Sequence, residues 1–407
     1  MGRAKEWMLE QLERGYSEAD GDICSECVSA PFLVGWISDN ASATTCTFCG
    51  RREEEPIAAA FDEFVGVVVG GIGFDWNHPD SEGISYISRE GGYQAAVSDL
   101  SDVLAGYDIS DKDDVVDALI ESIDDNGWVE RDYYIGDKSR RLEWGWESFK
   151  QITKHQTRYL FLSAVEEDGG GSVPASQMLH AIGEVIAKDL CDFEFVKTIG
   201  SDSDLIRIRI GADAFGTAAD IGSPPEELAI QSNRMSPAGV SMFYGAFDIA
   251  TAIAETLDPA QHAGQTISIG TFRALRELRV VDLAGLPAIP SVFDLERQHL
   301  IHPLRFLHAF VVDLAKPIAR DGREHFEYVP TQIVTEYFRR VFRGPGNVNP
   351  DGLIYRSARH PGGNAIVLFC RNSQCVDPGA QRDSWEEPLV CLHAVAHQSC
   401  PALPDLL

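Results

Sequence analysis

The spacing of hydrophobic residues divides the chain into a mainly helical first half and a mixed second half. In the first half, apolar residues recur every three or four positions, as at Val115, Leu119 and Ile123, and this spacing predicts amphipathic helices. The same spacing crosses residues 146–165 and 176–190, which we also expect to be helical. Between these two segments, the run "EEDGGGSVPA" is typical of a loop.

In the second half, short apolar runs that alternate with polar residues predict β-strands. The clearest is "LIRIRIG" at residues 205–211, where the alternation places Arg207 and Arg209 on one face of a strand. Similar patterns predict strands at 240–246, 265–275 and 278–285, helices at 293–317 and 330–342, and a hairpin at 351–369. Because these strands and helices follow no regular βαβ rhythm, the pattern favours an α+β fold.

The length and charge of the chain restrict its class. With 407 residues, it is long enough for two or three domains with cores of their own. Its 34 basic and 63 acidic residues give a net charge of −29, which repels nucleic-acid phosphates, so we expect no nucleic-acid partner. No apolar run reaches the length of a membrane span, and the charged start "MGRAKEWMLEQLERGY" lacks a signal-peptide core. We therefore expect a cytoplasmic protein without a membrane partner.

Four of the nine cysteines form a metal-binding pattern. Two C-x-x-C pairs, Cys24 with Cys27 and Cys46 with Cys49, are separated by eighteen residues. Each pair places two thiolates on one tight turn, and two such turns complete a tetrahedral zinc site. Since all four ligands would be protein side chains, this zinc would be structural. Free thiols are the alternative, whereas a disulfide is disfavoured in a reducing compartment.

A second candidate site lies in the segment "RMSPAGVSMFYGAFDIATAIAE", which begins at Arg234. The "SPAG" run predicts a turn, a strand ends near Tyr244, and Asp248 is a suitable N-cap for the helix that follows. Thr251 and Glu255 lie four residues apart and therefore share one face of that helix. Arg234, Tyr244 and Glu255 can thus converge on one site.

These three side-chain types suit a nucleotide substrate with a reactive sugar. An arginine binds phosphate, a tyrosine offers a flat face to a heteroaromatic ring, and a carboxylate stabilises a cationic sugar centre or activates a nucleophile. The alternative is a surface arginine, a core tyrosine and a solvated glutamate. Spacing alone favours that alternative.

The order of motifs in the second half resembles the RES domain family, which is named for its Arg, Glu and Ser. The family has an early strand with two arginines, an Arg before a small-residue turn, a "Y-x-A" strand end, a "T-A-x-x-E" helix and a late "G-x-x-Y-x-S" strand. This chain has "LIRIRIG", "NRMSPAG", "FYGAFD", "TAIAE" and "DGLIYRSAR" in the same order, and "YVPTQIVTEYF" resembles the family's "P-T-Q" helix. The resemblance covers residues 195–369, with Ile206 in place of the usual aromatic residue. The first half resembles the helical extension, with zinc-knuckle-like cysteines, of some RES proteins.

The resemblance implies a fold similar to that of ADP-ribosyltransferases and an enzyme that acts on NAD. Members are toxins of toxin–antitoxin pairs or effectors, so the chain would be an NAD hydrolase or phosphorylase that cleaves the nicotinamide–ribose bond. ADP-ribose transfer to a protein is the alternative reaction.

The resemblance also implies a role for each site residue. The expected catalytic residues are Glu255, Arg234 and Ser357, and the expected NAD-binding residues are Arg207, Arg209 and Tyr244. Arg207 and Arg234 would bind the phosphates of NAD, and Arg209 would assist them. The tyrosine would stack on nicotinamide, the glutamate would face the ribose, and the serine would donate a hydrogen bond near that ribose.

Two other functions compete with this interpretation. A HEPN-like ribonuclease would use an R-x(4–6)-H motif, and Arg320 and His325 have that spacing. They lie between two predicted helices of the second half, and the net charge opposes RNA binding, so a surface loop is the better interpretation. The other competitor is a non-enzymatic zinc adaptor, and the intact Arg, Tyr, Glu and Ser of the RES pattern argue against it.

The expected organisation has four parts. These are a helix and zinc knuckle at residues 1–55, a helical HEPN/RES N-terminal-like domain at 56–190, a RES domain at 191–385 and a C-terminal tail at 386–407. The expected fold class is α+β, with a mainly helical region followed by a mixed α+β domain similar to ADP-ribosyltransferases. Besides NAD, the candidate partners are an antitoxin or immunity protein and, in a homo-oligomer, a second copy of the chain.

Overall fold

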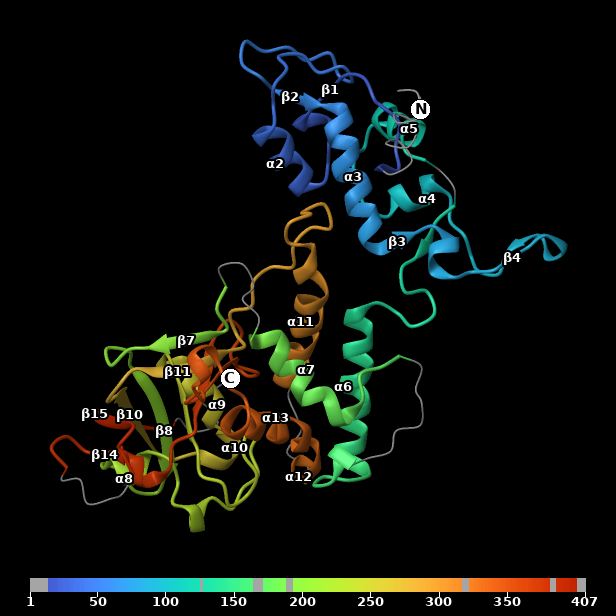
Figure 1. The fold of residues 1–407 in the computed structure, drawn as a ribbon. Coiled ribbons are helices and arrows are strands. Elements are labelled where there is room, and N and C mark those ends of the chain that lie inside the picture. The colour runs from blue at the N-terminus through green and yellow to red at the C-terminus, as the bar shows by residue number, and fades with distance from the viewer. Residues whose placement is uncertain are drawn as a thin grey trace. The chain divides into compact units, whose positions relative to one another are not determined.

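The computed structural model divides the chain into two compact units (Figure 1). Unit 1 comprises residues 1–139 and 288–303, and unit 2 comprises residues 140–287 and 304–407. The structure describes residues 14–124, 127–163, 171–187, 193–316, 322–380 and 386–400. In these described ranges, no helix is long and apolar enough to cross a membrane.

Unit 1 consists of helices and short two-stranded sheets. Its helices are α2 (Pro31–Asp39), α3 (Phe61–Asp75), α4 (Leu100–Ala105) and α5 (Asp113–Ser122), with short 3-10 helices at Ser25–Cys27, Pro79–Glu82 and Ser88–Glu90. Its strands are β1 (Asp22–Cys24), β2 (Ala58–Ala60), β3 (Trp76–Asn77), β4 (Tyr86–Ile87), β5 (Gly92–Tyr93) and β6 (Val129–Glu130). Strand β1 pairs antiparallel with β2, β3 with β6, and β4 with β5. Helix α5 confirms the helix predicted around Val115 and Leu119, which are both buried.

Helix α3 lies at the centre of the hydrophobic core of unit 1. Phe64, Val65 and Val68 are fully buried on this helix, at the three- and four-residue spacing of one face. Gly71 follows on the same helix, and a Cβ there would lie only 2.2 Å from the ring of Phe293. The glycine therefore makes room for an aromatic ring from residues 288–303, which explains why that segment belongs to unit 1.

Unit 2 contains a nine-stranded mixed sheet with the order β14-β15-β10-β8-β9-β13-β12-β11-β7. Its strands are β7 (Val196–Ile199), β8 (Leu205–Gly211), β9 (Phe243–Ala246), β10 (Thr266–Ala274), β11 (Leu278–Asp282), β12 (Gly352–Arg356), β13 (Asn364–Leu368), β14 (Cys375–Val376) and β15 (Val390–Ser399). Strand β11 pairs parallel with β12, and β14 with β15, while the other neighbours are antiparallel. This mixed sheet after a mainly helical region confirms the predicted α+β class.

The two faces of this sheet carry separate hydrophobic cores. Leu205 of β8 packs in one core with Phe243, whereas Ile206 packs in the other with Ala246 and with Ala252 of helix α9 (Ile249–Thr256). Alternate residues of "LIRIRIG" therefore point to opposite faces of the sheet, which confirms the predicted strand with Arg207 and Arg209 on one face.

The remaining helices of unit 2 gather beside the sheet, and Figure 1 shows α6, α7, α11 and α13 grouped there. They are α6 (Lys138–His155), α7 (Ala175–Ala187), α8 (Ala218–Ile221), α10 (Pro259–His262), α11 (Ile301–Ala315), α12 (Glu324–Glu327) and α13 (Val329–Arg340). Short 3-10 helices of unit 2 lie at Phe161–Ser163, Glu226–Leu228, Pro345–Asn347 and Asn372–Gln374, and another, Gln298–Leu300, lies in the 288–303 segment of unit 1. The helix predicted at 146–165 is therefore real, but it begins earlier, at Lys138, and ends at His155, whereas the helix predicted at 293–317 begins later, at Ile301.

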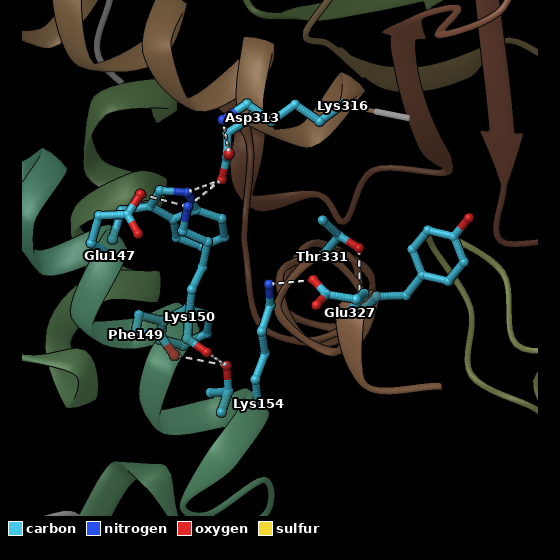
Figure 2. Close-up of polar contacts among 11 residues, drawn as sticks. Glu147, Phe149, Lys150, Lys154, Asp313, Lys316, Glu327 and Thr331 are labelled. Atoms are coloured by element: carbon cyan, nitrogen blue, oxygen red, sulfur yellow. Dashed lines mark hydrogen bonds and ion pairs between the residues drawn. The ribbon is translucent and has the colours of Figure 1, made fainter. Parts of the chain in front are cut away.

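A partly buried polar network joins α6 to α11 (Figure 2). Asp313 of α11 accepts hydrogen bonds of 2.8 Å from the Nζ atoms of Lys150 and Lys316 and from Trp146 Nε1. Burial alone would raise the pKa of Asp313, but the hydrogen bonds from Lys150, Lys316 and Trp146 lower it to about 2. The carboxylate therefore stays charged and holds the last turn of α11 against α6.

The expected domain boundaries remain predictions. The compact units divide the chain at residue 139, inside the expected helical domain 56–190, and assign residues 288–303 to unit 1. The expected tail at 386–407 contributes β15, which pairs with β10 along the full length of that strand. Its run "VCLHAVAHQS" alternates too weakly in polarity to predict a strand, and the neighbouring β10 supplies the hydrogen bonds that extend it.

Candidate functional site

Strands β8 and β9 are adjacent in the sheet of unit 2, and Arg207 of β8 also bonds to the backbone of β9. These two strands share the single pair Ile206 and Ala246. Beyond this pair, Arg207 Nη1 donates to the Tyr244 carbonyl at 2.6 Å, and its Nε donates to the Ile221 carbonyl at 2.7 Å. The Tyr244 carbonyl therefore accepts its hydrogen bond from a guanidinium of β8, and this bond fixes the backbone of Tyr244.

Arg207 stays charged in this buried position. Burial and then the repulsion of Arg209 lower the pKa of Arg207 to about 10, which still leaves it protonated at neutral pH. Its guanidinium carbon lies 5.2 Å from the centre of the Phe243 ring, a stabilising cation–π distance. Arg209 donates to the Asp220 carbonyl at 3.1 Å, and burial lowers its pKa as well.

Arg234 lies in the turn that leads to β9, at the end of helix α11. Its Nη1 donates to the carbonyl of Leu314, in the last turn of α11, where carbonyls lack partners within the helix. The helix dipole favours a cation at that end. Thr331 Oγ1 of α13 donates to the Arg234 carbonyl at 2.5 Å, and Gln332 Nε2 donates to the Asn233 carbonyl at 2.8 Å. The "P-T-Q" motif therefore holds the arginine turn.

Tyr244 is anchored to the same turn. Its hydroxyl is hydrogen-bonded to Ser236 Oγ at 2.9 Å. Burial raises the pKa of Tyr244 to about 12, so the phenol stays neutral at physiological pH. The arginine turn and the tyrosine therefore form one hydrogen-bonded assembly.

Glu255 and Ser357 are in direct contact. Ser357, directly after β12, donates from Oγ to Glu255 Oε1 at 2.5 Å. The same Oγ accepts from the backbone N–H groups of Arg359 and His360, at 3.2 and 2.9 Å, so its own hydrogen is directed to the carboxylate. Asp248 caps α9 by accepting from the Thr251 N–H at 2.7 Å, which confirms the predicted N-cap.

Tyr355 is a site residue that the sequence analysis did not select. Ala365 of β13 pairs with both Tyr355 and Ala246, so alternation places Tyr355 on the same sheet face as Tyr244. Burial and then the negative charge of Glu255 raise the pKa of Tyr355 well above its usual value, while nearby positive charges oppose the shift. Among the described residues, no protein group hydrogen-bonds to its hydroxyl. The "G-x-x-Y-x-S" motif contained the signal that could have identified it.

Four of the expected residues act electrostatically on the Tyr355 hydroxyl. The charged or polar groups that act on its hydroxyl are Glu255, Tyr244, Arg234 and Arg207. Ser357 joins them through Glu255. Arg209 lies beside Arg207 on β8, but in the described part of the chain its guanidinium contacts none of the other expected residues.

The three arginines share an unusual property. Among the described residues, none of them has a carboxylate partner within ion-pair distance, because each donates to backbone carbonyls instead. A carbonyl is neutral, so these bonds leave the positive charges of Arg207 and Arg234 in place, whereas the negative charge of Asp220 acts on Arg209 from beyond ion-pair distance. In a chain with a net charge of −29, this makes the region suited to an anionic ligand.

The candidate metal centre lies in unit 1, where all four expected cysteines meet. Their Sγ atoms all lie within 4.8 Å of one another. Cys24 Sγ is 3.7 Å from Cys27 and 3.6 Å from Cys49, and Cys27 is 3.6 Å from Cys46. Zinc–sulfur bonds of about 2.3 Å in a tetrahedron require sulfur–sulfur separations of about 3.8 Å. The four thiols therefore fit a tetrahedral metal ion.

Of the two residues of the HEPN-like alternative, the structure describes one. Arg320 lies outside the described residues, and His325 lies in α12, where its ring packs 5.2 Å from that of Phe326.

Two family models match the chain. Residues 205–389 match the RES domain, and residues 39–167 match the HEPN/RES N-terminal domain 1. The RES match contains Tyr355 and all six expected site residues, and the other match begins between the two C-x-x-C pairs. A RES domain indicates an NAD-utilising enzyme of a toxin-like family. No curated protein and no solved structure gives a significant match to the chain.

Proposed function

Since this chain belongs to the RES-domain proteins that carry a HEPN/RES N-terminal domain, we propose that it cleaves the nicotinamide–ribose bond of NAD. The observation that carries the proposal is the Ser357–Glu255 contact, together with the positive charges of Arg234 and Arg207, which act on the Tyr355 hydroxyl as Glu255 does. Bond cleavage leaves positive charge on the ribose, and Glu255 supplies a negative group beside it. One such electrostatic contact typically contributes about 2–4 kcal/mol to lowering a barrier.

The other residues divide the binding of NAD among them. Arg207 and Arg234 clamp the pyrophosphate, with Arg209 assisting from the same strand, because a guanidinium fork matches phosphate oxygens. Tyr244 stacks on the nicotinamide ring, and Tyr355 offers its unpartnered hydroxyl to the substrate. Ser357 keeps Glu255 in one orientation through the hydrogen bond from its hydroxyl.

The reaction is hydrolysis or phosphorolysis. With water as the acceptor, NAD gives nicotinamide and ADP-ribose, and with phosphate it gives nicotinamide and ADP-ribose 1″-phosphate. A protein acceptor would make the chain an ADP-ribosyltransferase through the same bond cleavage. Mass spectrometry of NAD incubated with purified protein, with and without phosphate, distinguishes the three products. Intact NAD under both conditions would contradict the proposal.

The biological role that follows is that of a cytoplasmic toxin or defence effector. Loss of NAD harms the cell that makes the enzyme, so an antitoxin or immunity protein is the expected partner. Expression that depletes cellular NAD and arrests growth would support this role, and growth at the normal rate with a full NAD pool would contradict it.

Zinc is the metal we propose for the cysteine cluster. Four thiolates without an open position describe a structural zinc site. Elemental analysis of untagged protein should find about one zinc per chain. A folded preparation that contains no metal would contradict the assignment.

A further inference from the structure

The loop between β12 and β13 contacts helix α9 at two side chains. Ser357 reaches Glu255, as described above, and the His360 Nδ1 atom lies 2.8 Å from Thr251 Oγ1. Thr251 and Glu255 are one turn apart on α9 and share a face. The loop is therefore fixed to the same helix face twice, once at the candidate catalytic carboxylate and once at a fully buried threonine.

The threonine contact continues to a carboxylate. Thr251 Oγ1 donates to Asp248 Oδ2 at 2.7 Å, while the Thr251 N–H donates to Asp248 Oδ1, also at 2.7 Å. The pKa of Asp248 is lowered mainly by the hydrogen bond from the Thr251 hydroxyl and next by the one from the Thr251 N–H. Asp248 is therefore a carboxylate at neutral pH and has no hydrogen to donate.

The hydrogen positions follow from this arrangement. A threonine hydroxyl has one hydrogen, and here that hydrogen points to Asp248. Thr251 Oγ1 can therefore only accept from His360, which requires a hydrogen on Nδ1. His360 is thus an Nδ1–H donor in its neutral form and remains one when protonated.

The loop is built around this contact. A Cβ at Gly363 would lie 2.2 Å from Thr251 Oγ1 and 2.7 Å from His360 Nδ1, so a larger residue would break the hydrogen bond. The Ser357 N–H donates to the Gly363 carbonyl at 2.9 Å, and the His360 N–H donates to Ser357 Oγ. The position of Ser357 thus depends on both ends of the loop.

We propose that His360 is a positioning residue for NAD cleavage: its Nδ1–H bond to Thr251 locks the loop that holds Ser357 against Glu255. This inference rests on the proposed function. The relay Asp248–Thr251–His360 acts through Ser357 and Glu255, and His360 itself takes no proton from the substrate.

The test compares two replacements of the histidine in the full chain. The amide of asparagine places an N–H near the Nδ1 position, so His360→Asn should keep kcat within about threefold of the parent. His360→Ala removes the donor, and kcat should fall about 10- to 100-fold with KM within about threefold, because a small misplacement of reacting groups costs up to about 10²-fold. His393→Ala, an exposed histidine on β15, is the matched control and should change neither constant.

Two results would overturn the inference. Equal loss of kcat in His360→Asn and His360→Ala, with unchanged melting temperatures, would mean that the ring acts as an acid or base. A parent-like kcat in His360→Ala would mean that the loop needs no lock. A Thr251→Val background adds a further check, because the His360→Ala effect should disappear in it.

A readout without NAD separates this inference from the proposed function. Nitrogen NMR of protein with labelled histidine, at a pH where the ring is neutral, should show the Nδ1–H tautomer for the signal lost in His360→Asn. The Nε2–H tautomer would contradict the relay even in an active enzyme. The Nδ1–H tautomer in a protein that leaves NAD intact would support the relay and reject only the proposed reaction.

Discussion

At the scale of single residues, the account depends on how Arg234 uses its hydrogen-bond donors. One Nη1–H group binds the Leu314 carbonyl, and among the described residues no protein group accepts from the rest of the guanidinium. The side chain is therefore anchored at one corner while the remaining donors are available. Such a half-anchored fork is oriented before the substrate binds, which reduces the entropy lost on binding.

Replacing Arg234 with lysine should weaken NAD binding and leave the fold intact. Lysine retains the charge but loses the fork, and a hydrogen bond to a charged group contributes about 1.5–3 kcal/mol. We expect kcat/KM to fall about 10- to 100-fold, with a melting temperature near that of the parent. Arg343→Lys is the matched control, because Arg343 also donates to carbonyls at a helix end but lies outside the site. A large drop in melting temperature in Arg234→Lys would identify the residue as structural.

Replacing Tyr355 with phenylalanine tests the residue that the sequence analysis did not select. The change removes only a hydroxyl that has no protein partner in the described structure, so the melting temperature should not fall. Loss of one hydrogen bond to the substrate should lower kcat/KM about tenfold, since such a bond contributes about 1–1.5 kcal/mol. Steady-state kinetics at low NAD measures this effect, and unchanged kcat/KM would place Tyr355 outside the substrate contacts.

At the scale of elements, the site is held by helix ends and turns around the sheet. The last turn of α11 receives Arg234, and Asp313 in the same turn is bound by Lys150 of α6. The sequence predicted β8, β9, the α9 cap and the hairpin well, because each has a local pattern. It could not predict the hydrogen bond from Arg207 of β8 to the Tyr244 carbonyl of β9, since that bond depends on which strands become neighbours.

Asp313 should contribute stability that depends on pH. Its pKa in the folded protein is about 2, below the ordinary value of an aspartate, so the stabilisation is present above pH 4 and is lost as the pH falls towards 2. Asp313→Asn should have a lower melting temperature at pH 7 and a flatter decline in acid. Asp204→Asn, in an exposed ion pair with Arg273, should change the melting temperature little. Identical acid profiles for the parent and Asp313→Asn would contradict this role.

At the scale of the whole molecule, the candidate metal centre belongs to unit 1 and the candidate NAD site belongs to unit 2. The sequence predicted that the four cysteines meet, which the structure confirms, and it predicted the RES domain, whereas the roles of the six RES residues stay predictions. It did not predict that residues 288–303 belong to unit 1, because the ring of Phe293 reaches the core of α3 only through a space left by Gly71. A packing contact between distant segments has no local signal.

Chelation should therefore affect the two units differently. Removing zinc from the cysteine cluster should raise hydrogen exchange around Cys24–Cys27 and Cys46–Cys49 in unit 1, because the closed site constrains those turns. NAD turnover by unit 2 should persist at about the parent rate. Loss of turnover in parallel with metal loss would show that the metal supports the reaction directly.

The most direct test of the central claim is NAD consumption by Glu255→Gln. Glutamine keeps the size of the side chain and can still accept a hydrogen bond from Ser357, but it removes the negative charge beside the ribose. We expect an unchanged melting temperature and a rate of nicotinamide release lower by about 10²–10³-fold, the usual cost of one transition-state contact. If Glu255→Gln released nicotinamide as fast as the parent protein, the charge of Glu255 would have no part in the reaction.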